Sequence, residues 1–208
     1  MSSLHGFITL NEMNRLKEED IKEMIQHLAD KFKYTSTLLN NLLSWARSQL
    51  DGYSVEPTSF NIYNQVDENI NVLSHQANEK NITIINETPE DTSVYADKNM
   101  INLVILNLLS NAIKFTRNNG EIKINATARD SEVKLCFEDN GIGIPPDKLE
   151  VLFEQSNFYT TDGTNDEKGT GLGLMLCSDF VAKNNGKIWA ESEEGKGSTF
   201  CITLPIDK

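Results

Sequence analysis

A heptad repeat near the N-terminus is the strongest constraint that this sequence places on its fold. Between about residues 21 and 46 the seam residues recur alternately four and three positions apart, and they are Ile21, Ile25, Leu28, Phe32, Thr35, Leu39, Leu42 and Ala46. This spacing predicts one long helix, which a capping box at Asp20 and Glu23 begins and Asp51-Gly52 ends. The preceding stretch LHGFITLNEM suits the end of another helix. A helical hairpin cannot bury such a seam alone, so we expect it to pair with a second copy as a homodimeric four-helix bundle. A hairpin packed only against its own downstream domain is the alternative.

Charge and composition exclude several classes of protein. The net charge of −12 argues against a nucleic-acid binder, which usually carries a basic face. Asparagines and a serine interrupt the most apolar stretch, MINLVILNLLSNAIKF, and no signal peptide is visible. We therefore expect a cytoplasmic chain, reaching a membrane only through segments outside it. Cys136, Cys177 and Cys201 share no metal-binding or redox spacing, which predicts buried free thiols in a reducing compartment.

From Phe60 onward the pattern changes to mixed helix and strand, after the turn-rich linker DGYSVEPTS. The sequence predicts helices over 64–80, 99–116, 145–153 and 172–186, a strand over 82–85, and strand pairs over 121–128 with 132–139 and 187–192 with 198–205. Helices interleaved with mostly antiparallel strands indicate an α+β fold, a two-layer sandwich. The boundary between the hairpin and this domain is predicted near residues 55–56.

Four polar or glycine-rich motifs follow one another through this second domain. In NLLSNAIKFT, Asn107, Asn111 and Lys114 occupy one helix face, opposite an apolar face that should be core. Carboxamide oxygens suit a hard divalent cation and a lysine suits a phosphate, although a solvated face is the simpler explanation of this motif alone.

The other three motifs are turns. In EDNGIGI, Asp139 ends a strand and precedes Gly141 and Gly143, where a flat base could approach the backbone; an ordinary hairpin turn is the alternative. GTGLGL is a glycine-rich loop that opens a helix and could hold phosphates, and EGKGSTF is a turn before the last strand, where Thr199 could bind a base. Each motif is weak evidence alone, but chance does not readily produce all four in this order and spacing.

In this order the motifs resemble those of sensor histidine kinases of two-component signalling, whose ATP-binding domain is shared with gyrase, MutL-like and chaperone ATPases. NLLSNAIKFT matches the N box, DNGIGI and GTGLGL the two glycine boxes, LFEQ with Phe153 the F box, and GKGST the closing turn. The resemblance covers essentially the whole chain. It implies a dimerisation and phosphotransfer hairpin over 1–55 and a catalytic ATP-binding domain over 56–208.

The resemblance also implies site roles. Asp139 and Thr199 would bind adenine, Asn111 with Asn107 would hold Mg²⁺, and Lys114 would neutralise phosphate charge. Phe115 and Phe153 would line the pocket, and the second glycine box would shape its phosphate end through Gly169, Thr170, Gly171, Leu172 and Gly173. QSNFYTTDGTNDEK would be an ATP lid that is ordered only with nucleotide bound, or else a surface loop.

By the same resemblance, the γ-phosphoryl group of ATP would pass to a histidine of the hairpin and then to an aspartate of a response-regulator receiver domain. His5 is a weak candidate for the acceptor, because HGFIT lacks the acidic residue and the proline of the family's acceptor box. His27 and His75 are expected to be structural or surface residues. We therefore expect the chain to begin after the acceptor box and to be unable to phosphorylate itself.

Two alternatives remain open. One is a degenerate ATP-binding regulatory module that acts through its dimer partner without kinase activity. The other is a serine kinase of the anti-sigma-factor type, which the heptad hairpin disfavours because that group lacks a dimerisation hairpin.

Overall fold

The structure is a computed structural model that describes residues 55–153, 161–165, 167 and 171–206, together with Ile25 and Thr35. The chain divides into two compact units, Met1–Leu43 and Ser44–Lys208. Ile25 and Thr35 are helical, in agreement with the predicted heptad helix, and the rest of that helix lies outside the described residues. Its pairing with a second copy stays a prediction.

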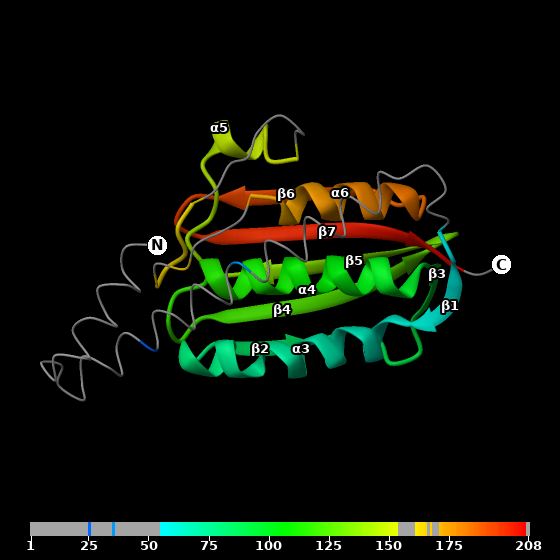
Figure 1. The fold of residues 1–208 in the computed structure, drawn as a ribbon, viewed down its shortest axis with the longest axis horizontal. Coiled ribbons are helices and arrows are strands. Elements are labelled where there is room, and N and C mark those ends of the chain that lie inside the picture. Colours follow the sequence, from blue (N-terminus) through cyan, green and yellow to red (C-terminus); the bar gives the residue numbers. More distant parts are fainter. Residues whose placement is uncertain are drawn as a thin grey trace, which may run out of the picture. The chain divides into compact units, whose positions relative to one another are not determined.

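A five-stranded mixed sheet forms one layer of the second unit (Figure 1). Its order is β2-β4-β5-β7-β6, and the strands are β2 Thr83–Asn86, β4 Glu121–Arg129, β5 Glu132–Asp139, β7 Gly197–Pro205 and β6 Ile188–Glu193. Only the β2–β4 pair is parallel. A separate antiparallel pair is made by β1 Thr58–Asn61 and β3 Ser93–Ala96.

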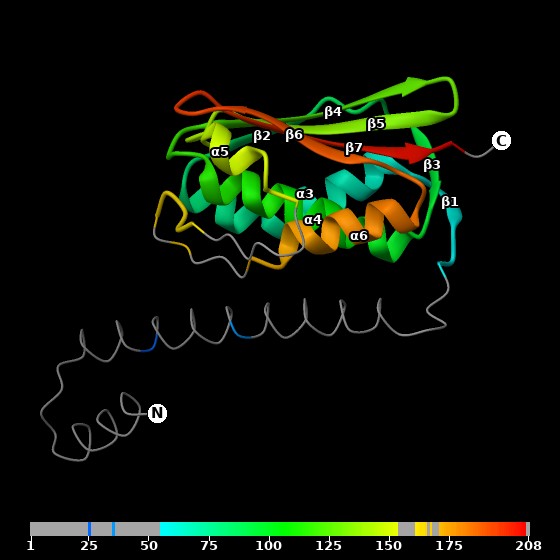
Figure 2. The same cartoon turned by 90° about the horizontal axis from the view of Figure 1, so that it is seen from above.

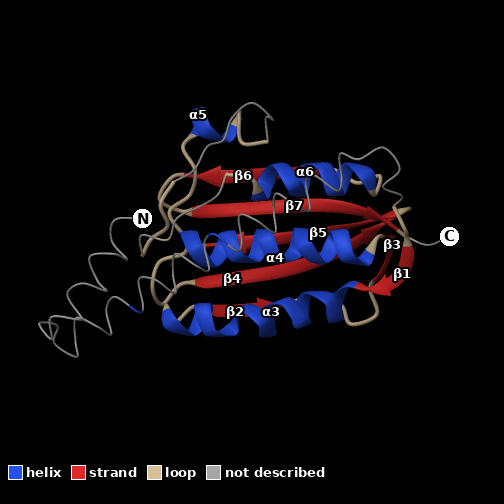
Figure 3. Ribbon diagram, in the orientation of Figure 1, coloured by secondary structure: helices blue, strands red, loops and turns tan. Residues whose placement is uncertain are grey.

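Three helices form the other layer and cover a single face of the sheet, as Figure 2 shows from the side and Figure 3 from the helix face. They are α3 Ile62–Glu79, α4 Lys98–Phe115 and α6 Gly173–Lys183. A short helix, α5 Pro146–Leu149, lies at one end. In the described part of the chain, no helix combines the length and the hydropathy that a membrane span requires.

The hydrophobic core lies between these layers and sets which face of α4 is turned outward. Alternate residues of β4, β5 and β7 point into it, and Phe137 and Leu135 are fully buried. The predicted apolar face of α4 is buried as well, with Ile101, Leu108 and Ala112 at most 4% exposed. The polar face of α4 is thereby directed away from the sheet.

Side-chain caps fix the starts of α3 and α4. Asp97 accepts hydrogen bonds from the backbone N–H groups of Asn99 and Met100 at 3.0 and 3.1 Å. Asn61 accepts one from Asn64 at 2.9 Å in the same way at α3. Such caps satisfy donors that have no partner within the helix.

The predicted α+β sandwich is confirmed, with two differences in detail. The strands β1 and β3 were not predicted, because each is only four residues long. The helix predicted over 145–153 is helical only over Pro146–Leu149, and turns follow it.

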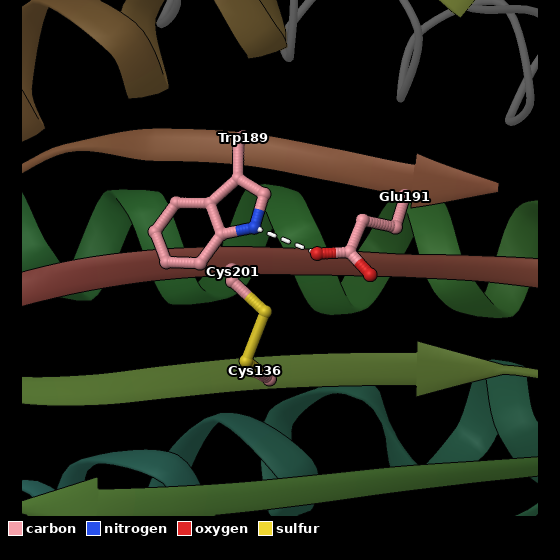
Figure 4. Close-up of a disulfide and its surroundings, with 4 residues drawn as sticks. All are labelled: Cys136, Trp189, Glu191 and Cys201. Carbon is pink, nitrogen blue, oxygen red and sulfur yellow. Dashed lines mark hydrogen bonds between the residues drawn. A yellow bond between two sulfur atoms is a disulfide. The ribbon is translucent and has the colours of Figure 1, made fainter.

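The prediction that all three cysteines are free thiols is wrong for two of them. Cys136 and Cys201 form a disulfide between β5 and β7 (Figure 4). They are directly opposed in the antiparallel register, which brings residues 65 positions apart in sequence to a Cα–Cα distance of 4.1 Å. Trp189 of β6 pairs with Cys201 and lies beside the disulfide in Figure 4. Cys177 is free and fully buried, as predicted, and burial raises the pKa of its thiol.

Candidate nucleotide-binding site

The C-terminal half of α4 presents the first group of predicted site residues. Asn107, Asn111 and Lys114 are half-buried along its outward face. The Asn107 side-chain Nδ2 donates to the Leu103 carbonyl at 2.8 Å, which leaves its Oδ1 as a hydrogen-bond acceptor. A Cβ added at Gly173 would lie 2.9 Å from this oxygen, so the N-terminus of α6 meets α4 at Asn107.

Lys114 lies one turn beyond these asparagines. Its Nζ donates to the Thr161 carbonyl at 2.7 Å and lies 4.7 Å from the centre of the Phe115 ring. Burial lowers the pKa of the Lys114 ammonium, although the neighbouring carboxylates of Glu167 and Asp162 act in the opposite direction. A partly desolvated ammonium beside a neutral carbonyl is suited to exchange that carbonyl for an anionic oxygen.

Asp139 ends β5 on the side of the sheet that faces the helices. It is 6% exposed, and its Oδ1 accepts a hydrogen bond from the Gly141 backbone N–H at 2.9 Å. Burial raises the pKa of this carboxyl to about 6, and backbone hydrogen bonds from Gly141 and Ser198 oppose that rise. Two backbone N–H groups thus hold the carboxylate in place as a hydrogen-bond acceptor, and the nearby charge of Glu138 adds to the rise in its pKa.

The neighbour of Asp139 on β7 is Ser198. The two residues are directly paired in the register, and Ser198 is 7% exposed. Thr199, the residue predicted to help bind the base, is paired instead with Glu138, whose side chain points to the opposite face of the sheet. The structure therefore brings Ser198, and not Thr199, to the Asp139 side. Strand alternation counted from the buried Phe200 predicts the same side for Ser198.

Glycines allow the turns around Asp139 to approach other backbone segments closely. A Cβ at Gly141 would collide with the Phe115 carbonyl, and the next residue, Ile142, donates its N–H to that carbonyl at 3.1 Å. Gly143 has φ +68° and faces the Glu193 carbonyl with no space for a side chain. The Asp139 turn is thus joined to the end of α4, and the predicted base and phosphate residues come together.

The second glycine box is described only in part. Gly169 and Thr170 lie outside the described residues, as does His5. Gly171 has φ +72°, and Leu172 is the N-cap of α6, which begins at Gly173. Phe153, the predicted F-box residue, is half-buried and packs against the core.

Of the two positions expected for His75, a surface residue or a structural one, the structure shows the surface residue. Its side chain is 85% exposed on α3, where Nδ1 lies 3.6 Å from Glu79 Oε1.

Known proteins that are similar to this chain indicate its family. Residues 96–208 match the family described as histidine kinase-, DNA gyrase B-, and HSP90-like ATPase. The adaptive-response sensory kinase SasA of Synechocystis sp. is 33% identical over 88% of this chain. Among solved structures, the catalytic domain of histidine kinase ThkA is 34% identical over 72% of this chain and 95% of that one, with a TM-score of 0.63. ThkA in complex with the response regulator TrrA is 26% identical over 98% of this chain and 56% of that one, with a TM-score of 0.76.

The chain spans about half the length of the curated relative, 48% of SasA. The matched residues contain β4, β5 and β7 as well as α4 and α6, and so they include every described residue of the candidate site. The chain belongs to the histidine kinase-, DNA gyrase B- and HSP90-like ATPase family, and it carries the ATPase domain of a two-component sensor histidine kinase.

Proposed function

We propose that residues 56–208 bind Mg-ATP for transfer of its γ-phosphoryl group to a histidine, with adenine at Asp139 and the phosphates at the outward face of α4. The observation that carries this proposal is the buried Asp139 carboxylate, which the glycine turn and Ser198 hold in place next to the end of α4.

At the base end, the ionised Asp139 carboxylate accepts a hydrogen bond from the exocyclic amino group of adenine. Gly141 has no side chain to fill the space beside Asp139 Oδ1. Ser198 takes the supporting role that Thr199 was predicted to have, because it lies on the Asp139 side of the sheet. A buried acceptor gives base selectivity, because a base without the amino group would leave a lone pair of the carboxylate buried without its partner.

At the phosphate end, Lys114 exchanges the Thr161 carbonyl for a phosphate oxygen. The Asn107 Oδ1 and the Asn111 carboxamide fit a hard cation that keeps most of its waters, since both supply neutral oxygen ligands. When bound, Mg²⁺ supplies neutralisation of the phosphate charge. The N-terminus of α6, which meets Asn107, adds backbone N–H groups to this end of the site.

The protein then has to position ATP and neutralise the charge of its phosphates, because phosphoryl transfer needs little covalent participation from side chains. The acceptor would be a histidine of a dimerisation hairpin, to which residues 1–55 contribute as a homodimer. ThkA has been solved in complex with a response regulator. We propose the same class of partner for this chain, with an aspartate of the receiver domain as the second acceptor.

Two experiments test this proposal. One measures the binding of Mg-ATP to the chain, and the other incubates the chain with Mg²⁺ and γ-labelled ATP. We expect Mg-ATP binding by calorimetry that is lost in Asp139→Ala, and no acid-labile label on the chain, because HGFIT does not match the acceptor box. Acid-labile label on His5 would contradict that second expectation. Absence of Mg-ATP binding in the wild-type chain would refute the proposal.

A second candidate function is an ATP-binding regulatory module without kinase activity. The observation in its favour is that no histidine of this chain has the flanking sequence of an acceptor. One assay distinguishes the two functions. A kinase would transfer label from ATP to a separately supplied hairpin that contains an acceptor box, and a regulatory module would not.

A further inference from the structure

Lys80 is a buried lysine outside the residues assigned to the nucleotide. It ends α3 as the C-cap residue, and it is only 3% exposed. Lysine is almost never fully buried unless it is paired. Its Nζ donates to the carbonyls of Ile113 and Lys114 at 2.8 and 3.0 Å and to Glu167 Oε1 at 2.9 Å. An ammonium has three N–H donors, so this one is fully used.

Two of the three acceptors belong to the last turn of α4. Carbonyl groups in the last turn of a helix have no donor within it and carry the negative end of the helix dipole. A cation at this place stabilises the end of α4. Lys114, the residue proposed to bind the phosphates, belongs to this last turn. Lys80 therefore acts on the backbone of Lys114 directly.

The third acceptor, Glu167, organises a turn that is fastened to the same end of α4. Its Oε2 accepts from the Asn165 N–H at 2.8 Å, and its carbonyl accepts from the Gly163 N–H at 2.8 Å. Thr164 donates its N–H to the Lys114 carbonyl at 3.1 Å and its hydroxyl to the Thr116 carbonyl at 2.8 Å.

Glu167 places a negative charge close to Lys114. The carboxylates of Glu167 and Asp162 both interact with the Lys114 ammonium electrostatically, and Glu167 is the stronger of the two. An uncompensated carboxylate here would compete with phosphate oxygens for Lys114 and would repel the triphosphate. The only cation that the structure places in hydrogen-bond contact with Glu167, among the described residues, is Lys80.

We propose that Lys80 is a positioning residue for the triphosphate of ATP, because it neutralises Glu167 and so leaves Lys114 to the phosphates. This inference rests on the proposed function. It goes beyond it by assigning the phosphate affinity of the site to a lysine that does not touch the nucleotide.

Binding of Mg-ATP and of adenosine, measured by calorimetry and by NMR titration on the full chain, tests the inference. Lys80→Met should weaken Mg-ATP binding by about ten-fold, the order typical of coupling between linked sites, and leave adenosine binding unchanged. The double variant Lys80→Met/Glu167→Gln should recover most of the Mg-ATP affinity, because the uncompensated carboxylate is gone. A purely structural lysine would not be rescued by removal of its partner's charge.

Glu167→Gln alone keeps Lys80 in place and covers the case in which Lys80→Met does not fold. It should strengthen Mg-ATP binding by about two- to three-fold, because a negative charge near Lys114 is removed while the amide oxygen still accepts from Lys80. Unchanged or weaker binding in this variant overturns the inference.

The matched control is Lys123→Met, which removes a lysine from a half-exposed ion pair with Glu121 at 2.9 Å on the sheet. It should bind Mg-ATP like the wild type. If wild type and control both bind Mg-ATP and Lys80→Met binds equally well, or loses ATP and adenosine alike, the inference fails while the proposed function stands. If the wild type does not bind Mg-ATP, the proposed function itself fails.

Discussion

Asp139→Asn should make the nucleotide-free protein more stable while it removes the acceptor for adenine. Burial raises the pKa of the Asp139 carboxyl from 3.8 to about 6. The folded state therefore holds this proton more tightly than the unfolded chain, and the protein loses stability as the pH rises from about 4 to about 6. At about 1.4 kcal/mol for each pKa unit, the ionised carboxylate costs about 3 kcal/mol above that window.

An asparagine at this position is neutral at every pH and avoids the cost. It keeps one oxygen for the N–H groups of Gly141 and Ser198 but replaces the other with an amide nitrogen, which offsets part of the gain. We expect the free energy of unfolding at pH 8 to rise by about 1–3 kcal/mol in Asp139→Asn and to match the wild type near pH 4.

Urea unfolding followed by circular dichroism, without nucleotide, measures this difference at the two pH values. Asp91→Asn, at an exposed turn residue, is the matched control and should change stability at neither pH. A variant that is less stable than the wild type at pH 8, or a stabilisation of equal size at both pH values, would contradict a destabilising charge at Asp139. The first result would mean that the carboxylate is stabilised by its hydrogen bonds, and the second that its charge is irrelevant.

Three further predictions concern the same site and its sheet. Mg-ATP affinity should fall by up to about ten-fold for each pH unit below 6, because the ionised Asp139 is a much stronger acceptor for the adenine amino group than the protonated carboxyl; a flat calorimetric profile between pH 5 and 7 would contradict this. Lys114→Ala should weaken Mg-ATP binding with adenosine binding unchanged, and an equal loss for both ligands in titrations would argue against its phosphate role. Cys136→Ser/Cys201→Ser should lower the free energy of unfolding by about 2–4 kcal/mol relative to the oxidised protein, and equal stability in urea would show that the crosslink does not stabilise the fold.

Local patterns were sufficient to predict most of the ATP-binding domain. The apolar periodicity over 99–116 corresponds to α4 Lys98–Phe115, and the alternation over 121–139 corresponds to the β4–β5 hairpin. Both are long segments in which one face is buried, so the period of the sequence and the period of the structure agree. β1 and β3 are four residues each, which is too short for a period to be recognised in the sequence.

Non-local register explains what the sequence could not predict. The Cys136–Cys201 disulfide depends on the pairing of β5 with β7, which no spacing of cysteines reports. The role of Lys80 likewise depends on the ends of α3 and α4 meeting the turn that contains Glu167, 87 positions away in the chain. In contrast, the position of Ser198 on the Asp139 side of the sheet follows from local alternation along β7, because Ser198 and the buried Phe200 are two residues apart and share one face.

A crystal structure of the full chain with Mg²⁺ and a non-hydrolysable ATP analogue would locate the nucleotide. We expect the exocyclic amino group of adenine within hydrogen-bond distance of the Asp139 carboxylate. We expect the phosphates at Lys114, with the metal at Asn107 and Asn111. Adenine bound elsewhere, or phosphates that do not contact the outward face of α4, would contradict the proposed nucleotide site.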